Sequence, residues 1–247
     1  MKTMNLALIL ALATTLTTPL VKAEYVWGVD AKNEVYFWNG ISWQVVKGHL
    51  KHISVGADGT MWGVNANDEV WLYSGNHQWT RIPGNLKQID VGTKQQVWGV
   101  DANNQVFRWN GSSWQHVPGS LKHVSVGADG TVWGIGPDNQ IWQYNGQGWT
   151  QIPGALKQID VGSAQYIWGV SSNDHIYRWS GQFWQRIEGS LKYVSVGAKG
   201  TVWGVDANDG IFIWTGNGWR QVQGSLKQLE CADYLYYKIE KKPSCYF

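Results

Sequence analysis

The chain has 247 residues, of which 43% are hydrophobic and 15% are charged, and its formal net charge is +2. It contains 18 Trp, 11 Tyr and 30 Gly but only 6 Pro, a composition that excludes a disordered or collagen-like chain. No run of five or more like charges occurs. The sequence therefore gives no electrostatic indication of a nucleic-acid partner or of an acidic lipid partner.

The first 23 residues have the pattern of an export signal. Lys2 provides a positive region, residues 6–13 an apolar stretch, and residues 21–23 a permissive cleavage site. Four threonines and Pro19 interrupt the apolar stretch well short of the roughly 20 residues that a transmembrane helix needs. We expect cleavage after Ala23 and a secreted, extracellular chain that does not insert into membranes. Cleavage removes two of the 20 basic residues and no acid, so the mature chain has equal numbers of basic and acidic residues.

An internal repeat predicts the fold. The tripeptide Trp-Gly-Val, once Trp-Gly-Ile, occurs six times at intervals of 35 or 36 residues. It begins at Trp27, Trp62, Trp98, Trp133, Trp168 and Trp203. In the third copy, alternating apolar and polar residues predict strands near 97–100, 105–109, 114–117 and 121–126. Four short strands per repeat indicate the blade of a β-propeller, with a solenoid of stacked coils as the alternative.

The repeats alternate between two types, which indicates a double blade of about 70 residues copied three times. Segments such as Leu50-Lys51-His52-Ile53-Ser54 alternate with segments such as Leu86-Lys87-Gln88-Ile89-Asp90. The last segment, residues 226–230, is of the second type, which is missing in front of Trp27. The sequence therefore predicts an all-β, six-bladed propeller of four-stranded blades within residues 24–247. One blade is shared between the two chain ends, which removes free sheet edges.

The cysteines and one glycosylation motif bear on an exported chain. Cys231 and Cys245 are the only cysteines, and both lie in the last 17 residues. Oxidising conditions favour a Cys231–Cys245 disulfide that fastens the closing strand, with two reduced thiols as the alternative. Asn110-Gly111-Ser112 is the single N-glycosylation acceptor, and it matters only in a eukaryotic host.

Each repeat carries three tryptophans, and their positions in the repeat suggest different roles. The first, in Trp-Gly-Val, is expected to pack between blades, and the second belongs to an aromatic-x-aromatic pair that suits a core. The third begins a polar strand, which we expect to be the outermost and partly exposed. An exposed indole beside amides and hydroxyls is typical of sugar recognition, with simple covering of the blade edge as the alternative. The candidate carbohydrate-binding residues are Trp43, Trp79, Trp114, Trp149, Trp184 and Trp219.

Catalytic and metal-binding patterns are missing from the sequence, and we expect no cofactor and no enzymatic activity. His52 and His123 occupy a repeat position that Tyr193 also fills, and the other four histidines lie at unlike positions. Asp90, Asp160 and Glu230 share one repeat position and predict an acidic ring around the central channel. We interpret this ring as a structural hydrogen-bonding feature, because a glycosidase needs two carboxyl groups in different environments. Catalysis would require the ring to lie in a deep pocket.

The repeat resembles that of a known family. The unit Leu-Lys-x-Ile-x-Val-Gly, Trp-Gly-Val-Asn/Asp, Ile-Tyr-x-Trp and Trp-x-x-Ile-Pro-Gly is similar to the tectonin repeat over residues 25–231. Tectonins of slime moulds and fungi, fish-egg lectins and the lipopolysaccharide-binding tachylectin share that repeat. The chain departs from the fish-egg and tachylectin members in having only two cysteines and more tryptophan.

The resemblance implies a multivalent propeller lectin in innate defence. Its partners would be surface glycans such as lipopolysaccharide, N-acetylglucosamine or O-methylated sugars. A protein-binding propeller scaffold without lectin activity is the alternative function, because exposed tryptophans serve protein recognition equally well.

Overall fold

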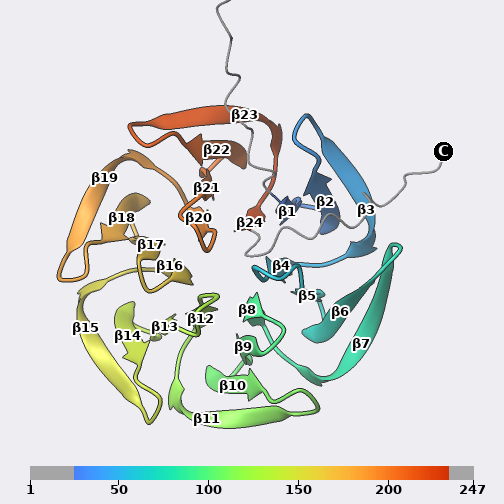
Figure 1. Ribbon diagram of the computed structural model, residues 1–247, viewed down its shortest axis with the longest axis horizontal. Helices are drawn as coiled ribbons and strands as arrows, with labels where there is room; N and C mark the ends of the chain where they lie inside the picture. The colour runs from blue at the N-terminus through green and yellow to red at the C-terminus, as the bar shows by residue number, and fades with distance from the viewer. Residues whose placement is uncertain (1–24, 234–247) are drawn as a thin grey trace, which may run out of the picture.

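The computed structural model describes residues 25–233, which form a closed ring of six antiparallel sheets with four strands each (Figure 1). This confirms the predicted six-bladed propeller and excludes the solenoid. The part of the chain that the structure describes contains no helix long and apolar enough to cross a membrane. The predicted signal segment, residues 1–23, and Cys245 lie outside the described residues.

Each blade runs from an inner strand at the central channel to an outer strand at the rim (Figure 1). The inner strands are β4 (His52–Val55), β8 (Gln88–Thr93), β12 (His123–Val126), β16 (Gln158–Ser163), β20 (Tyr193–Val196) and β24 (Gln228–Ala232). The second strands carry the Trp-Gly motif and are β1 (Tyr25–Val29), β5 (Met61–Val64), β9 (Gln96–Val100), β13 (Val132–Ile135), β17 (Tyr166–Val170) and β21 (Val202–Val205).

The third strands carry the aromatic pairs and are β2 (Glu34–Trp38), β6 (Glu69–Gly75), β10 (Gln105–Trp109), β14 (Gln140–Tyr144), β18 (His175–Trp179) and β22 (Gly210–Trp214). The outer strands are β3 (Trp43–His49), β7 (Gln78–Asn85), β11 (Trp114–Ser120), β15 (Trp149–Ala155), β19 (Trp184–Ser190) and β23 (Trp219–Ser225). All six outer strands begin at or next to the third tryptophan of the repeat, as the polar sequence there predicts.

The two ends of the chain share one blade. Its strand order is β24-β1-β2-β3, and β24 pairs antiparallel with β1 so that Val26 faces Cys231 and Trp27 faces Glu230. Leu226 and Leu229, just before and within β24, are buried in the core between this blade and the preceding one. The last repeat segment therefore supplies the inner strand that the first repeat lacks.

The core lies between neighbouring blades. Trp62 of one blade, 3% exposed, packs against Trp109 and Trp114 of the next blade. The glycine of the Trp-Gly motif makes room for the leucine of the Leu-Lys segment, because a Cβ on Gly63 would lie 2.4 Å from Leu50 Cδ1. The expected packing roles of the first and second aromatic positions are thus confirmed.

The turn between the second and third strands of each blade has one Asn or Asp with a positive φ. In the shared blade this residue is Asn33, with φ of 68°, and in the next blade it is Asp68, with φ of 64°. Asn and Asp tolerate this left-handed conformation better than most residues do. The Asn- and Asp-rich segments are therefore hairpin turns.

Candidate functional site

The six candidate tryptophans are half-buried and bridge adjacent blades. Trp149 shows the arrangement: its ring lies 6.4 Å from that of Trp98 in the preceding blade, with the two rings nearly perpendicular. Its Nε1–H donates a hydrogen bond to the carbonyl of Pro118 on the preceding outer strand, at 3.0 Å. Trp43, Trp79 and Trp219 donate equivalent bonds to a neighbouring outer strand, whereas Nε1 of Trp114 and of Trp184 is buried without a partner.

A glycine on each preceding outer strand makes this bridge sterically allowed. A Cβ on Gly119 would lie 2.6 Å from Nε1 of Trp149, and Gly119 has a φ of +148°. The same glycine recurs under all six indoles. These rings are therefore partly exposed, as predicted, but much of each ring is used to hold the blades together.

One of the six tryptophans lines a groove between blades. Trp71 and Trp79 form part of a hollow of about 530 Å³ between β3 and β7, a size typical of small-molecule sites. Its polar lining includes His49, His77 and Gln78. Aromatic surface and hydrogen-bonding side chains therefore lie together in this groove.

Sequence reasoning missed the two histidines of the groove. They occupy unlike repeat positions, since His49 is the last residue of β3 and His77 lies in the β6–β7 hairpin, which contains one additional residue. Its tip, Asn76-His77, has φ values of 50° and 58°, which is the pattern of a two-residue hairpin turn with both central residues left-handed. The insertion was visible as the single interval of 36 residues between Trp62 and Trp98.

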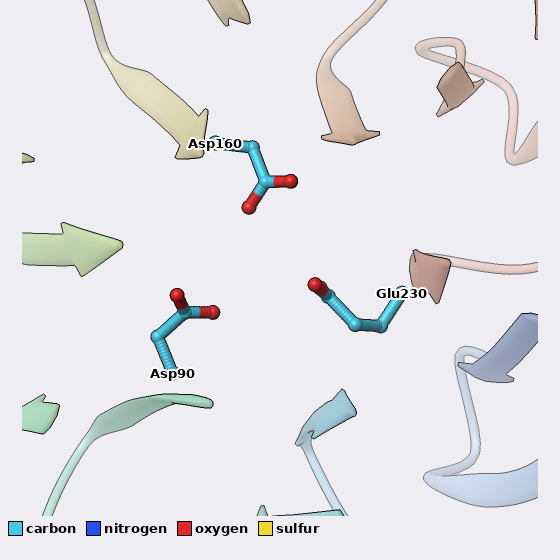
Figure 2. A group of neighbouring side chains, drawn as sticks. All are labelled: Asp90, Asp160 and Glu230. Carbon is cyan, nitrogen blue, oxygen red and sulfur yellow. The ribbon is translucent and has the colours of Figure 1, made fainter. Parts of the chain in front are cut away.

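The predicted acidic ring exists at the centre of the propeller. Asp90, Asp160 and Glu230 come from β8, β16 and β24 and point toward one another (Figure 2). All three are buried, and their nearest carboxylate oxygens lie within 4.8 Å of one another. Oxygen ligands of this kind suit a hard cation such as Ca²⁺, so these are residues that could hold a metal.

All three carboxylates have hydrogen-bond partners in adjacent blades, and the partner of Glu230 is the Ser195 side chain. The Asp90 carboxylate accepts hydrogen bonds from the Ser54 hydroxyl at 3.1 Å and from the backbone N–H of Val126 at 2.6 Å. Asp160 accepts the backbone N–H of Val196 at 2.5 Å. Oε2 of Glu230 is buried without a partner. These hydrogen bonds fit the structural interpretation of the ring, and one carboxylate oxygen of Glu230 is the exception.

Burial shifts the protonation of the ring. It raises the pKa of Asp90 to about 6, because a desolvated carboxylate is costly. Burial also raises the pKa of Asp160 and of Glu230 well above their ordinary values, and the neighbouring carboxylates add to both shifts. The cavity that Asp90 and Glu230 line holds about 20 Å³, room for a water molecule and not for a sugar ring. The deep pocket that catalysis would require is therefore not found at this ring.

Two further predicted positions are only partly visible. Cys231 is buried and has no cysteine partner within residues 25–233, and its backbone N–H donates a hydrogen bond to the Ser195 hydroxyl at 2.9 Å. Its predicted partner Cys245 lies outside the described residues, so the disulfide stays a prediction. Asn110 is exposed in the β10–β11 turn, where its Oδ1 accepts the N–H groups of Ser112 and Ser113.

Comparison with known proteins identifies the family. A model of the tectonin domain matches residues 20–111 and 94–231, which is most of the chain. The chain belongs to the tectonin family. It is 46% identical to Tectonin-1 and 44% identical to Tectonin-2 of Physarum polycephalum, over 46 residues in each case. These matches cover 19% of this chain, 21% of Tectonin-1 and 13% of Tectonin-2.

Solved structures show that this tectonin shares its fold with distant propellers. The WD40 propeller domain of Doa1 superposes with a TM-score of 0.56 at 13% identity, over 83% of this chain and 78% of that one. YCF48 bound to a D1 peptide superposes with a TM-score of 0.54 at 14% identity, over 81% and 78%. At such low identity the likeness concerns the fold alone.

Proposed function

We propose that this tectonin is a secreted, non-catalytic lectin that binds microbial or other surface glycans through the groove between β3 and β7. The observation that carries the proposal is the composition of the groove, where Trp71 and Trp79 lie beside His49, His77 and Gln78. Aromatic rings stack on the C–H faces of sugars, while the histidine and amide groups can bond hydroxyls. Lipopolysaccharide, N-acetylglucosamine and O-methylated sugars are the ligand classes that the family resemblance suggests.

Secretion and multivalency are part of the proposal. The export pattern of residues 1–23 supports secretion. A single exposed sugar site is weak, because hydroxyls exchange water for protein hydrogen bonds at little net gain. The groove supplies one site per chain, and we place further, weaker sites at the third-position tryptophans of the other blades. Several engaged sites can raise the avidity by roughly 10² to 10⁴ without a new contact. We therefore expect weak binding of free sugar and strong binding of coated beads or bacteria.

The test begins with a glycan array on the mature chain, residues 24–247. The glycans that bind are then titrated calorimetrically against the double variant His77→Asn/Gln78→Ala. Asn keeps the positive φ of position 77 accessible, so the hairpin should be retained. Gln147→Ala, in the corresponding turn of another blade, is the matched control.

The expected result is loss of binding in the groove variant and unchanged binding in the control. A chain that binds no glycan on the array and on coated beads contradicts the lectin proposal. Equal affinity of all three proteins shows that the groove is not the site, even where glycan binding occurs.

Protein binding is the alternative, and one comparison favours keeping it. The structurally similar YCF48 was solved with a D1 peptide bound. A competition experiment separates the two functions, because free sugar should release a glycan target and leave a protein partner bound.

A further inference from the structure

Six lysines surround one end of the central channel, one from each repeat. They are Lys51, Lys87, Lys122, Lys157, Lys192 and Lys227, each just before an inner strand. Lys122, Lys157, Lys192 and Lys227, from four consecutive blades, line a cavity of about 450 Å³ at this mouth. We call this cavity the lysine mouth.

The direct partners of these lysines neutralise only half of them. Lys51, Lys157 and Lys192 form ion pairs with Asp68, Asp174 and Asp209 in the turn of the same blade. The other three donate instead to neutral amide oxygens: Lys87 to Asn104, Lys122 to Asn139 and Lys227 to Asn33. An incoming anion would compete with neutral acceptors at these three blades.

The surroundings of the three amide-bonded lysines are unfavourable for their positive charges. Burial lowers the pKa of Lys87, Lys122 and Lys227, although carboxylates such as Asp101 and Asp138 offset part of the effect. For Lys87 and Lys227, neighbouring lysines add to the lowering. A bound anion would relieve this repulsion and desolvation.

The floor of the lysine mouth is polar and uncharged. His123, Gln158 and Tyr193 line the cavity below the lysines. Burial lowers the pKa of His123 to about 4, so its imidazole is neutral near pH 7. The acidic ring lies further along the same inner strands, so the mouth itself presents ammonium groups above a neutral layer.

We propose that the lysine mouth binds one compact ligand that carries several phosphate groups on a single ring. Lysines from four blades line one cavity, so a ligand with phosphates spread around a ring can reach several of them at once. A single phosphate would fill only a small part of a cavity of about 450 Å³. The site is distinct from the β3–β7 groove and does not depend on the lectin function.

The experiment titrates the mature chain with inositol hexakisphosphate by calorimetry at low and high salt. We expect one ligand per chain and weaker binding at high salt, because ionic contacts are screened. The test variant is Lys122→Gln/Lys227→Gln, which changes the two cavity lysines that lack a carboxylate partner. Loss of a charge-assisted hydrogen bond to phosphate should weaken binding by about tenfold for each lysine.

Two further variants separate a built site from general charge. Lys94→Gln/Arg220→Gln removes the same two charges elsewhere: Lys94 follows the far end of β8 and Arg220 lies on the outer strand β23, and both are exposed. It should bind like the native chain. Lys122→Arg/Lys227→Arg keeps the charges and should retain most of the affinity. Circular dichroism and thermal melting verify that every variant is folded.

The source of the phosphates is decided by a second arm with phosphatidylcholine vesicles that contain phosphatidylinositol bisphosphate. Binding of the vesicles assigns the site to a lipid headgroup, and binding of the soluble probe alone assigns it to a free ligand. The proposal is overturned if neither probe binds or if several probes bind per chain. It is also overturned if the Lys94/Arg220 control loses as much affinity as the test variant.

Discussion

The Asp233 carboxylate accepts a hydrogen bond from the backbone N–H of Lys199 at 2.8 Å, which links the shared blade to the preceding blade. It also accepts the Thr201 hydroxyl at 2.7 Å. In two other blades the corresponding turn carries its own aspartate, and Asp58 accepts the N–H of Thr60 at 3.0 Å. Lys199 stands where that aspartate would be, so the residue after β24 supplies the missing carboxylate from the shared blade.

We predict that Asp233→Ala weakens ring closure. The backbone N–H groups of Lys199 and Thr201 and the Thr201 hydroxyl lose their acceptor. Unpaired donors of this kind cost about 1–3 kcal/mol in unfolding free energy. Urea denaturation monitored by tryptophan fluorescence measures the loss. Introducing Lys199→Asp into the Asp233→Ala chain should restore part of the stability, since the turn then resembles that of Asp58. The same substitution in the native chain should destabilise it, because two carboxylates then compete for one turn.

Deletion of residues 226–247 should unfold the whole ring rather than trim one blade. The deletion removes β24, exposes the edge of β1 and takes away the buried Leu226 and Leu229. Differential scanning calorimetry should show loss of the single cooperative transition. Deletion of residues 234–247 keeps β24 and Asp233 and should retain the ring. An unchanged melting temperature in the longer deletion would refute the closure model.

Glu230→Gln should stabilise the chain most at alkaline pH. An acid with a raised folded pKa binds more protons in the folded state, so its contribution to stability is lost as pH rises through that pKa. The pKa values of Glu230 and Asp160 are raised well above their ordinary values, and the pKa of Asp90 is raised from 3.8 to about 6. Unfolding in a chelator-containing buffer should therefore show the variant gaining on the native chain as the pH rises above 4.5, the ordinary pKa of glutamate. Parallel pH profiles would contradict the burial of these charges.

Two histidines at the channel, His52 and His123, should make the folded chain less stable as the pH falls, whereas the acidic ring makes it less stable as the pH rises. Burial lowers the pKa of His52 from 6.5 to about 3 and that of His123 from 6.5 to about 4. A base with a depressed folded pKa contributes stability above its unfolded pKa, and this is lost as pH falls toward the folded value. His52→Gln/His123→Gln should flatten the profile between about pH 6.5 and 4.

Glutamine is a matched replacement for these histidines, because Gln88 and Gln158 alternate with them around the channel. His52 Nε2 lies 2.8 Å from the Ile89 carbonyl, and Gln88 Nε2 donates to the Val124 carbonyl at the same distance. The double variant should therefore fold at neutral pH. A native chain with the same acid sensitivity as the variant would show that other groups control it.

Trp149→Ala should destabilise the propeller by about 2–4 kcal/mol, since it removes an indole that bridges two blades and leaves a cavity. Phe183→Ala is the control: Phe183 is 61% exposed, and loss of such a side chain should change stability by no more than about 0.5 kcal/mol. Guanidinium denaturation compares them. Equal effects of the two substitutions would mean that the Trp149 bridge contributes nothing.

The architecture was predictable from the sequence, because one 35-residue pattern occurs six times. The spacing of Trp62 and Trp98 sets the blade length, and the glycines and Asn or Asp residues mark each turn. The alternation of segment types also predicted closure, since the strand missing before Trp27 is present at residues 226–230. Each of these features is local to one repeat or is repeated in every copy, so the chain itself displays it.

Tertiary structure alone decided which atoms meet between blades. Asp233 reaches Lys199, Trp149 reaches Pro118, and His49 joins Trp79 in one groove. The partners in the first two pairs lie more than 30 residues apart in sequence. They come together only because the ring curves by a fixed angle at each blade and then closes. The net charge of the chain, which is near zero, gave no indication of the lysine mouth. Composition averages charge over the whole surface, whereas the closed ring places one lysine of every repeat at a single opening.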